Sequence, residues 1–231
     1  MLLEVQNLKK NYGNRTVVNI PSLGINQGEA VGLVGNNGAG KTTLFRMILD
    51  LIRPTEGKVL SNGVDVSKSD QWKAYTGSFV DEGFVIDYLT PEEYFDFIGQ
   101  INHLSRAAIQ EQLNKFAEVF NDEILKKGKY IRDLSKGNKN KVGIAASLLA
   151  NPQLLILDEP FANLDPTTQI RLKKLIREYK AHDVTMFISS HDLNHVTEVC
   201  DRIVILEKGV VVKDLITSQD TLKELESYFA A

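Results

Sequence analysis

One short loop, residues 35–42, constrains the fold more than any other part of the chain, and its sequence is Gly-Asn-Asn-Gly-Ala-Gly-Lys-Thr. It fits the phosphate-binding pattern G-x-x-x-x-G-K-[ST] without a mismatch. The apolar residues 30–34 before it are typical of a buried strand, and residues 43–49 after it have the apolar stripe of a helix. The sequence therefore predicts a strand, a phosphate-binding loop and a helix in succession.

Each residue type in this loop has a chemical reason. Glycines let the backbone curl so that successive N–H groups point at an anion, and the following helix directs its unpaired amides and positive dipole end to the same point. Lys41 is expected to reach the β- and γ-phosphates, and the Thr42 hydroxyl is expected to ligate Mg²⁺. The predicted nucleotide-binding residues of the loop are Gly35, Asn36, Asn37, Gly38, Ala39, Gly40, Lys41, Thr42 and Thr43.

Two acidic residues, Asp158 and Glu159, follow four large apolar residues at 154–157. Such a run is typical of a central parallel strand, whose carboxyl end is where α/β sheets bind ligands. Strand side chains alternate, and Pro160 should favour an extended Glu159, so the two carboxylates are predicted to point in different directions. We expect Asp158 to ligate Mg²⁺ and Glu159 to face an attacking water, although acids that end a strand are more commonly only solvated.

His191 follows a further apolar run, residues 186–190, and is therefore also expected at the ligand-binding edge of the sheet. His195 lies four residues further on, a spacing that can ligate zinc. However, Asp192 replaces the glutamate of the metalloprotease pattern, and no third ligand is evident in the sequence. Asp192 is more simply explained as the cap of a helix over residues 193–200, so we do not expect a zinc site.

The middle of the chain has a different character from the strands around it. Thr90-Pro91-Glu92-Glu93 is a capping box with proline at the first helical position. Helices are predicted over residues 91–101 and 105–120, and a third begins after Ser135. The chain is therefore predicted to be one domain, residues 1–231, in which a helical lobe (83–150) is inserted into an α/β core lobe (1–82 and 151–231).

The third helix begins with Ser135-Lys136-Gly137-Asn138-Lys139. Ser135 is a good N-cap, whereas lysines are unusual in a first turn, where the helix dipole favours acids. Cations at a positive helix end are explained if an anion binds there. The alternative is a capped helix with a solvated basic face.

The remaining signals are weaker. Short strands are predicted at residues 3–6, 11–14 and 16–20, and Tyr12 lies next to a turn glycine. Tyr12 could be a core or edge residue or a platform on which an adenine base stacks, and the sequence leaves both open. Asp165 is expected to cap a helix over residues 166–180.

Composition limits the location and partners of the chain. The net charge of −3 gives no reason to expect nucleic acid as a partner. The single cysteine, Cys200, excludes an internal disulfide and is expected to be buried. The longest weakly polar run, residues 142–150, is far shorter than the roughly 20 residues that span a membrane. We expect a cytoplasmic protein that contacts a membrane only through a partner.

These motifs, in this order and over essentially the whole chain, resemble those of the ATP-binding cassette (ABC) transporter ATPases. Tyr12 is similar to the adenine-stacking aromatic of that family and His191 to its switch histidine. Residues 35–43 resemble the Walker A loop, 134–138 the signature motif, 154–159 Walker B and 163–165 the D-loop.

The sequence departs from the family pattern in two places. The signature contains Lys136-Gly137-Asn138, a variant associated with exporters of drugs, lipids or peptides, and Asp81-Glu82 replaces an expected glutamine that ligates Mg²⁺. Asp81 is therefore only a weak candidate for a metal ligand beside Thr42 and Asp158.

The resemblance implies an α/β fold: a P-loop NTPase core with a mainly parallel sheet, an N-terminal antiparallel β subdomain and an inserted α-helical lobe. It also implies a Mg²⁺-dependent ATPase that pairs head to tail with a second copy of itself and powers a separate membrane-spanning exporter at the inner face of the cell membrane. Glu159 and His191 would be catalytic. The residues that would contact the partner's ATP in trans are Ser135, Lys136, Gly137, Asn138 and Asp165.

Three other functions are less consistent with the sequence. A soluble ABC protein of translation or DNA repair usually carries two cassettes, a coiled-coil insertion or zinc cysteines, and the sequence has none of these features. An inactive regulatory cassette is disfavoured because Lys41, Glu159 and His191 are intact. An importer subunit is expected less than an exporter subunit, because little sequence follows the core.

Overall fold

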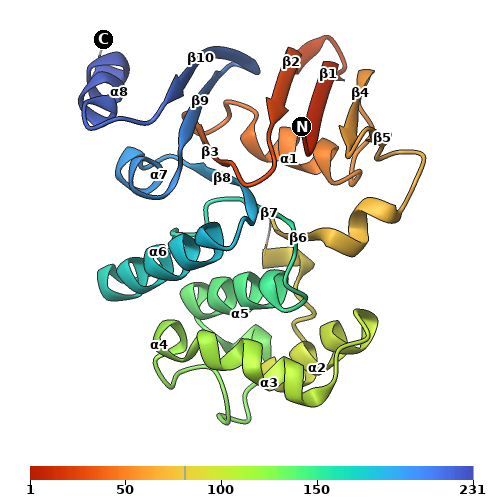
Figure 1. Cartoon of the computed structure of the whole chain (residues 1–231), viewed down its shortest axis with the longest axis vertical. Helices are drawn as coiled ribbons and strands as arrows, with labels where there is room; N and C mark the ends of the chain where they lie inside the picture. The colour runs from red at the N-terminus through yellow and green to blue at the C-terminus, as the bar shows by residue number, and fades with distance from the viewer. Residues whose placement is uncertain (81, 231) are drawn as a thin grey trace.

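Two sheets and eight helices make up the part of the chain that the computed structural model describes, residues 1–80 and 82–230 (Figure 1). The larger sheet has the strand order β10-β9-β3-β8-β7-β6, and only β10 runs antiparallel to its neighbour. Its strands are β3 (Ala30–Val34), β6 (Thr76–Phe79), β7 (Leu154–Leu157), β8 (Thr185–Ser190), β9 (Arg202–Glu207) and β10 (Val210–Ile216). The predicted α/β fold with a mainly parallel sheet is confirmed.

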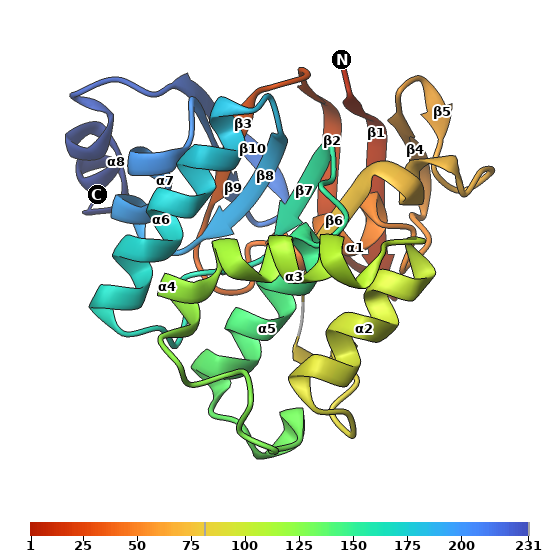
Figure 2. The ribbon, with the colours of Figure 1, turned by 60° about the horizontal axis from the view of Figure 1, so that its bottom comes forward.

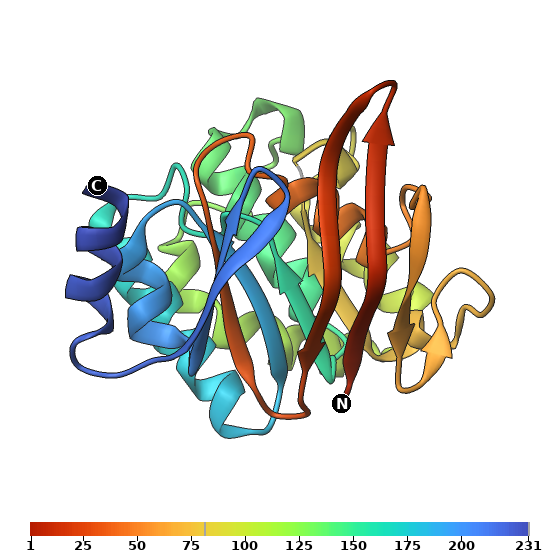
Figure 3. The same ribbon diagram turned by 90° about the horizontal axis from the view of Figure 1, so that it is seen from above.

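The smaller sheet is antiparallel and has the order β2-β1-β4-β5. Its strands are β1 (Leu3–Tyr12), β2 (Arg15–Ile25), β4 (Glu56–Ser61) and β5 (Val64–Asp65). The prediction of three short strands before residue 21 was wrong, because β1 and β2 form one long hairpin, which Figure 3 shows from above. The polar residues 9–11 resemble a loop in the sequence, but pairing across the hairpin keeps them extended, with a bulge between Lys10 and Asn11.

Helices α2 to α5 gather at the end of the molecule away from both chain termini (Figures 1 and 2). They are α2 (Pro91–Ile101), α3 (Arg106–Lys115), α4 (Ala117–Phe120) and α5 (Lys136–Leu148). The capping box at Thr90 is confirmed, since its side chain accepts from the backbone N–H of Glu93 and the Glu93 side chain accepts in return. The helix predicted over 105–120 is divided at Phe116 into α3 and α4.

The other helices are α1 (Lys41–Ile48), α6 (Pro166–Ala181), α7 (Leu193–Val199) and α8 (Thr221–Ala230), and short 3₁₀ turns occur at η1 (Gln71–Tyr75), η2 (Glu82–Phe84) and η3 (Ile131–Asp133). Asp165 caps α6 as predicted, by accepting from the backbone N–H of Thr168. None of the helices in the described residues is long and apolar enough to cross a membrane.

The core divides into two clusters, and one of them fixes α1. Leu44, Phe45 and Met47 of α1 are buried in the same cluster as apolar residues of β1, β2 and β3. Phe45 also packs edge-on against Phe187 of β8, with ring centroids 4.9 Å apart. Because α1 is held between the two sheets, the loop that precedes it begins and ends on fixed elements.

The second cluster includes Cys200, which is buried as the sequence predicts. Burial raises the pKa of its thiol to about 12, so the thiolate that reacts with oxidants is scarce near neutral pH.

Candidate functional site

The loop between β3 and α1 adopts a conformation that requires glycine at two positions. Gly40 precedes α1 with a φ of +109°, and a Cβ there would lie 2.8 Å from the carbonyl oxygen of Val17. A Cβ on Gly35 would lie 2.3 Å from the carbonyl oxygen of Leu206. The loop therefore packs directly on neighbouring backbone. It lines a cavity of about 320 Å³, called the phosphate cavity below after the sequence pattern of the loop. The cavity is lined by Arg15, Val17, Asn36, Asn37, Gly38, Ala39, Gly40, Lys41, Thr42, Thr43, Asp158 and Glu159.

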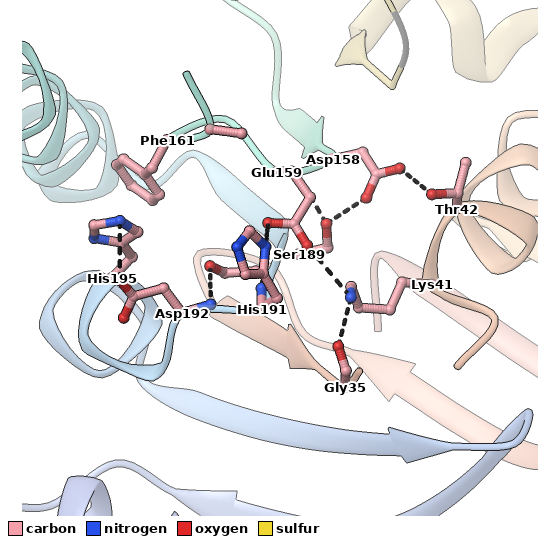
Figure 4. A network of polar contacts seen from close by, with 12 residues as sticks. Gly35, Lys41, Thr42, Asp158, Glu159, Phe161, Ser189, His191, Asp192 and His195 are labelled. Atoms are coloured by element: carbon pink, nitrogen blue, oxygen red, sulfur yellow. Dashed lines mark hydrogen bonds and ion pairs between the residues drawn. The ribbon is translucent and has the colours of Figure 1, made fainter. Parts of the chain in front are cut away.

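Lys41 is the buried cation of this cavity, with 6% of its surface exposed. Its Nζ donates to the carbonyl oxygen of Gly35 at 2.6 Å and lies 3.3 Å from Oε1 of Glu159 (Figure 4). In the structure, the Lys41 ammonium is therefore paired with the Glu159 carboxylate, at the place where the phosphate-binding pattern predicts an anionic phosphate.

Asp158 is held from two sides by hydroxyl groups. Thr42 Oγ1 donates to Asp158 Oδ2 at 2.5 Å, and Ser189 Oγ donates to the other oxygen, Oδ1 (Figure 4). Burial raises the pKa of Asp158, and the two donated hydrogen bonds oppose that rise. A hydroxyl and a carboxylate oxygen side by side, next to the phosphate-binding loop, are the hard oxygen donors that Mg²⁺ prefers, so Thr42 and Asp158 fit this ion.

Glu159 turns away from Asp158, and its backbone shows why. Strand β7 ends at Leu157, and Glu159 has a φ of +50°, in the left-handed region. The expectation that Pro160 keeps Glu159 extended was therefore wrong, although the two carboxylates do point to different partners. Glu159 Oε2 accepts from the backbone N–H of His191 at 3.2 Å and lies 2.8 Å from His191 Nδ1.

The two histidines have different partners. His191 is exposed beside Glu159, whereas the His195 ring is buried against Phe161, with ring centroids 4.6 Å apart (Figure 4). His195 Nε2 lies 3.6 Å from Asp192, and burial lowers the pKa of this imidazole more than Asp192 raises it. Asp192 also caps α7, as predicted, by accepting from the backbone N–H of Asn194 at 2.9 Å.

The first turn of α5 packs on the loop that follows Glu159. A Cβ on Gly137 would lie 2.4 Å from the carbonyl oxygen of Asn163, and Asn140 Nδ2 donates to the carbonyl oxygen of Ala162 at 2.8 Å. Ser135 caps this helix as predicted, accepting from the backbone N–H of Asn138 at 3.2 Å. The described residues that line the phosphate cavity do not include Ser135, Lys136, Gly137, Asn138 or Asp165.

Tyr12 is not brought to the cavity. Tyr12 ends β1 with 54% of its surface exposed, and Lys10 Nζ lies 5.1 Å from the centre of its ring. Tyr12 is not among the described residues that line the phosphate cavity. Asp81 lies outside the described residues.

Sequence reasoning missed Arg15, which lines the cavity, and Ser189, which bonds Asp158. A signal for Ser189 did exist. It lies on the strand that ends one residue before His191, at the edge where α/β sheets bind ligands. Arg15 reaches the cavity only through the hairpin of β1 and β2, which the sequence did not predict.

Comparison with known proteins gives concordant results. The model of the family described as "ABC transporter" matches residues 18–162. The chain is 33% identical over 228 residues to the lantibiotic transport ATP-binding protein SrtF of Streptococcus pyogenes, covering 99% of this chain and 96% of that protein. It is 34% identical over 220 residues to the lipopolysaccharide export system ATP-binding protein LptB of Haemophilus influenzae, covering 91% and 89%.

A solved structure described as a dimeric bacterial ABC transporter cassette has the same fold, with a TM-score of 0.83. It is 23% identical in sequence, and the match covers 94% of this chain and 99% of that one.

Proposed function

The chain belongs to the ABC transporter ATPase family, and from this premise we propose that it is the nucleotide-binding subunit of a separate membrane-spanning exporter. The observation that carries the proposal is the convergence of Lys41, Asp158, Glu159 and His191 at the carboxyl edge of one sheet. Export is favoured over import by the similarity to an ATP-binding protein of lipopolysaccharide export and by the variant signature at residues 136–138.

In the proposed site, the loop amides and Lys41 bind the β- and γ-phosphates of ATP, and Thr42 and Asp158 hold Mg²⁺, which adds positive charge against the phosphates. The triphosphate must first displace the Glu159 carboxylate from Lys41, since Lys41 Nζ and Glu159 Oε1 lie 3.3 Å apart in the structure. Glu159, released from the lysine but still beside His191, is then free to accept a proton from the attacking water. Phosphate binding thus converts Glu159 from a partner of the lysine into a general base.

One chain supplies only part of the proposed site. Ser135 and its neighbours lie at the start of α5, which packs on the loop after Glu159. We place these residues and Asp165 against the ATP of a second copy in a head-to-tail pair, and the dimer formed by a cassette of the same fold supports the pairing of two copies. Tyr12, which is 54% exposed, is proposed to stack on adenine, and Mg²⁺ ligation by Asp81 stays a weak proposal.

We further propose that the chain divides into a core lobe (1–82 and 151–231) and a helical lobe (83–150), and that the membrane subunit docks where the two lobes meet. A groove of about 390 Å³ lies between β6 and helices α2 and α5, and its apolar lining includes Phe79, Val85 and Tyr94. At its rim, Phe84 and Ile101 are 54% and 58% exposed. Since the chain belongs to a transporter family and the described residues contain no helix that could span a membrane, we propose that an apolar cytoplasmic segment of the membrane subunit occupies this groove. The chain would then work at the inner face of the cell membrane.

Ile101→Glu should abolish co-purification with the membrane-spanning subunit while the ATPase rate of the isolated chain changes less than twofold. The charge lies at the groove but outside the phosphate cavity, and burying it unpaired against an apolar segment is costly. The measurement is affinity purification from detergent-solubilised membranes of cells that produce both subunits.

The matched control is Ile170→Glu, because Ile170 is 67% exposed on α6 and does not line the groove. It should co-purify like the wild type. If Ile101→Glu and Ile170→Glu retain the membrane subunit equally, the groove is not the docking site.

A further inference from the structure

A buried hydroxyl joins the two carboxylate residues of the proposed site. Ser189 lies on β8, which is the strand between β3, leading to the phosphate-binding loop, and β7, leading to Asp158. Its side chain is fully buried, with 0% exposed. Ser189 Oγ donates to Asp158 Oδ1 and accepts from the backbone N–H of Glu159 at 2.9 Å. One oxygen atom therefore contacts two neighbouring residues of different proposed roles (Figure 4).

The bond to Asp158 fixes the plane of the carboxylate. Thr42 Oγ1 contacts Oδ2 and Ser189 Oγ contacts Oδ1, so each oxygen is held by a hydroxyl from a different element. Without Ser189, the carboxylate could rotate about its Cβ–Cγ bond. Groups that hydrogen-bond to a metal ligand orient it in this way, and their loss usually lowers metal affinity or activity by about 10–100-fold.

The bond to Glu159 acts on the backbone. Glu159 has a φ of +50°, which a residue other than glycine adopts rarely and only where its surroundings hold it. The backbone N–H of Glu159 is directed at Ser189 Oγ, and its carboxylate then lies between Lys41 and His191. The hydroxyl thus stabilises the turn from which Glu159 faces the phosphate cavity.

We propose that Ser189 is a positioning residue for ATP hydrolysis, whose single hydroxyl both orients Asp158 toward Mg²⁺ and holds the backbone turn that directs Glu159 at the γ-phosphate. The inference rests on the proposed function of the site. A hydroxyl has one proton to donate and lone pairs to accept, and Ser189 uses both capacities on adjacent residues. A serine that only fills the core would need one partner for its hydroxyl, whereas Ser189 bonds two adjacent residues of the proposed site.

The test compares Ser189→Ala, which removes both bonds, with Ser189→Thr, which keeps the hydroxyl. The expected result for Ser189→Ala is a kcat about 10–100-fold lower at saturating Mg²⁺ and a several-fold higher Mg²⁺ concentration for half-maximal rate. Affinity for fluorescent ATP in the presence of EDTA should change less than twofold, because Ser189 is not among the described residues lining the phosphate cavity. Ser189→Thr should recover most of the kcat.

The control is Ser61→Ala in the smaller sheet, because Ser61 is 1% exposed and its Oγ also makes a side-chain hydrogen bond, which is partly buried, with Tyr75 at 3.0 Å. It should lower the melting temperature about as much as Ser189→Ala and leave kcat near that of the wild type. A Ser189→Ala kcat within twofold of Ser61→Ala would overturn the inference, as would a Ser189→Thr as slow as Ser189→Ala. A wild type that hydrolyses no ATP would instead overturn the proposed function itself.

Discussion

Glu159→Gln should slow steady ATP hydrolysis by about 10²–10⁴-fold, the usual contribution of a general base, while ATP binding persists. The amide cannot accept the proton from water, but it keeps the size of the side chain. It also removes the negative charge that lies 3.3 Å from Lys41 Nζ, so the lysine becomes easier for a phosphate to reach. We therefore expect nucleotide affinity to equal or exceed that of the wild type. Phosphate release and fluorescent-nucleotide titration measure the two quantities.

Glu111→Gln is the matched control for this variant, because Glu111 is exposed on α3 and does not line the phosphate cavity. Its turnover should match that of the wild type. Hydrolysis by Glu159→Gln at the wild-type rate, or a loss of ATP affinity in that variant, would contradict the role given to Glu159.

Lys41→Ala should lower the affinity for ATP by about 10–150-fold, which corresponds to the roughly 1.5–3 kcal/mol of a hydrogen bond to a charged group. Lys41 is only 6% exposed, so water replaces its ammonium poorly, and the loop amides remain as the other phosphate donors. Hydrolysis should fall below detection at ATP concentrations that saturate the wild type. Titration calorimetry with ATP measures the affinity directly.

The control for Lys41→Ala is Lys173→Ala on α6, which also removes a buried lysine from a carboxylate, here Glu198 at 2.6 Å. Lys173→Ala is expected to lose stability but not nucleotide affinity. Equal ATP affinities for the two alanine variants would show that Lys41 does not bind the phosphates.

The sequence predicted those parts of the site that are contiguous in the chain. The phosphate-binding loop and the pair Asp158–Glu159 follow directly from a strand, a glycine pattern and two acids, so local residue types were sufficient. The caps at Thr90, Asp165 and Asp192 were also predictable, since a cap depends on a few neighbouring residues.

The parts that were missed or wrong depend on contacts between distant segments. The backbone of Glu159 lies in the left-handed region, whereas the following Pro160 favours an extended conformation at this position. The backbone N–H of Glu159 donates to Ser189, which lies thirty residues further along the chain. Arg15 reaches the cavity because β1 and β2 form one continuous hairpin. Such contacts follow from strand order, which a single sequence does not specify.

Two copies of the chain are proposed to complete each other's ATP site, and sedimentation velocity of Glu159→Gln with and without ATP tests this pairing. We expect a monomer without nucleotide and a species of twice the mass with ATP. Adding Ser135→Ala to this variant should weaken the dimer and leave the ATP affinity of the monomer unchanged, because Ser135 is assigned to the partner's ATP and is not among the described residues that line its own cavity. A Glu159→Gln chain that stays monomeric at saturating ATP would contradict the claim.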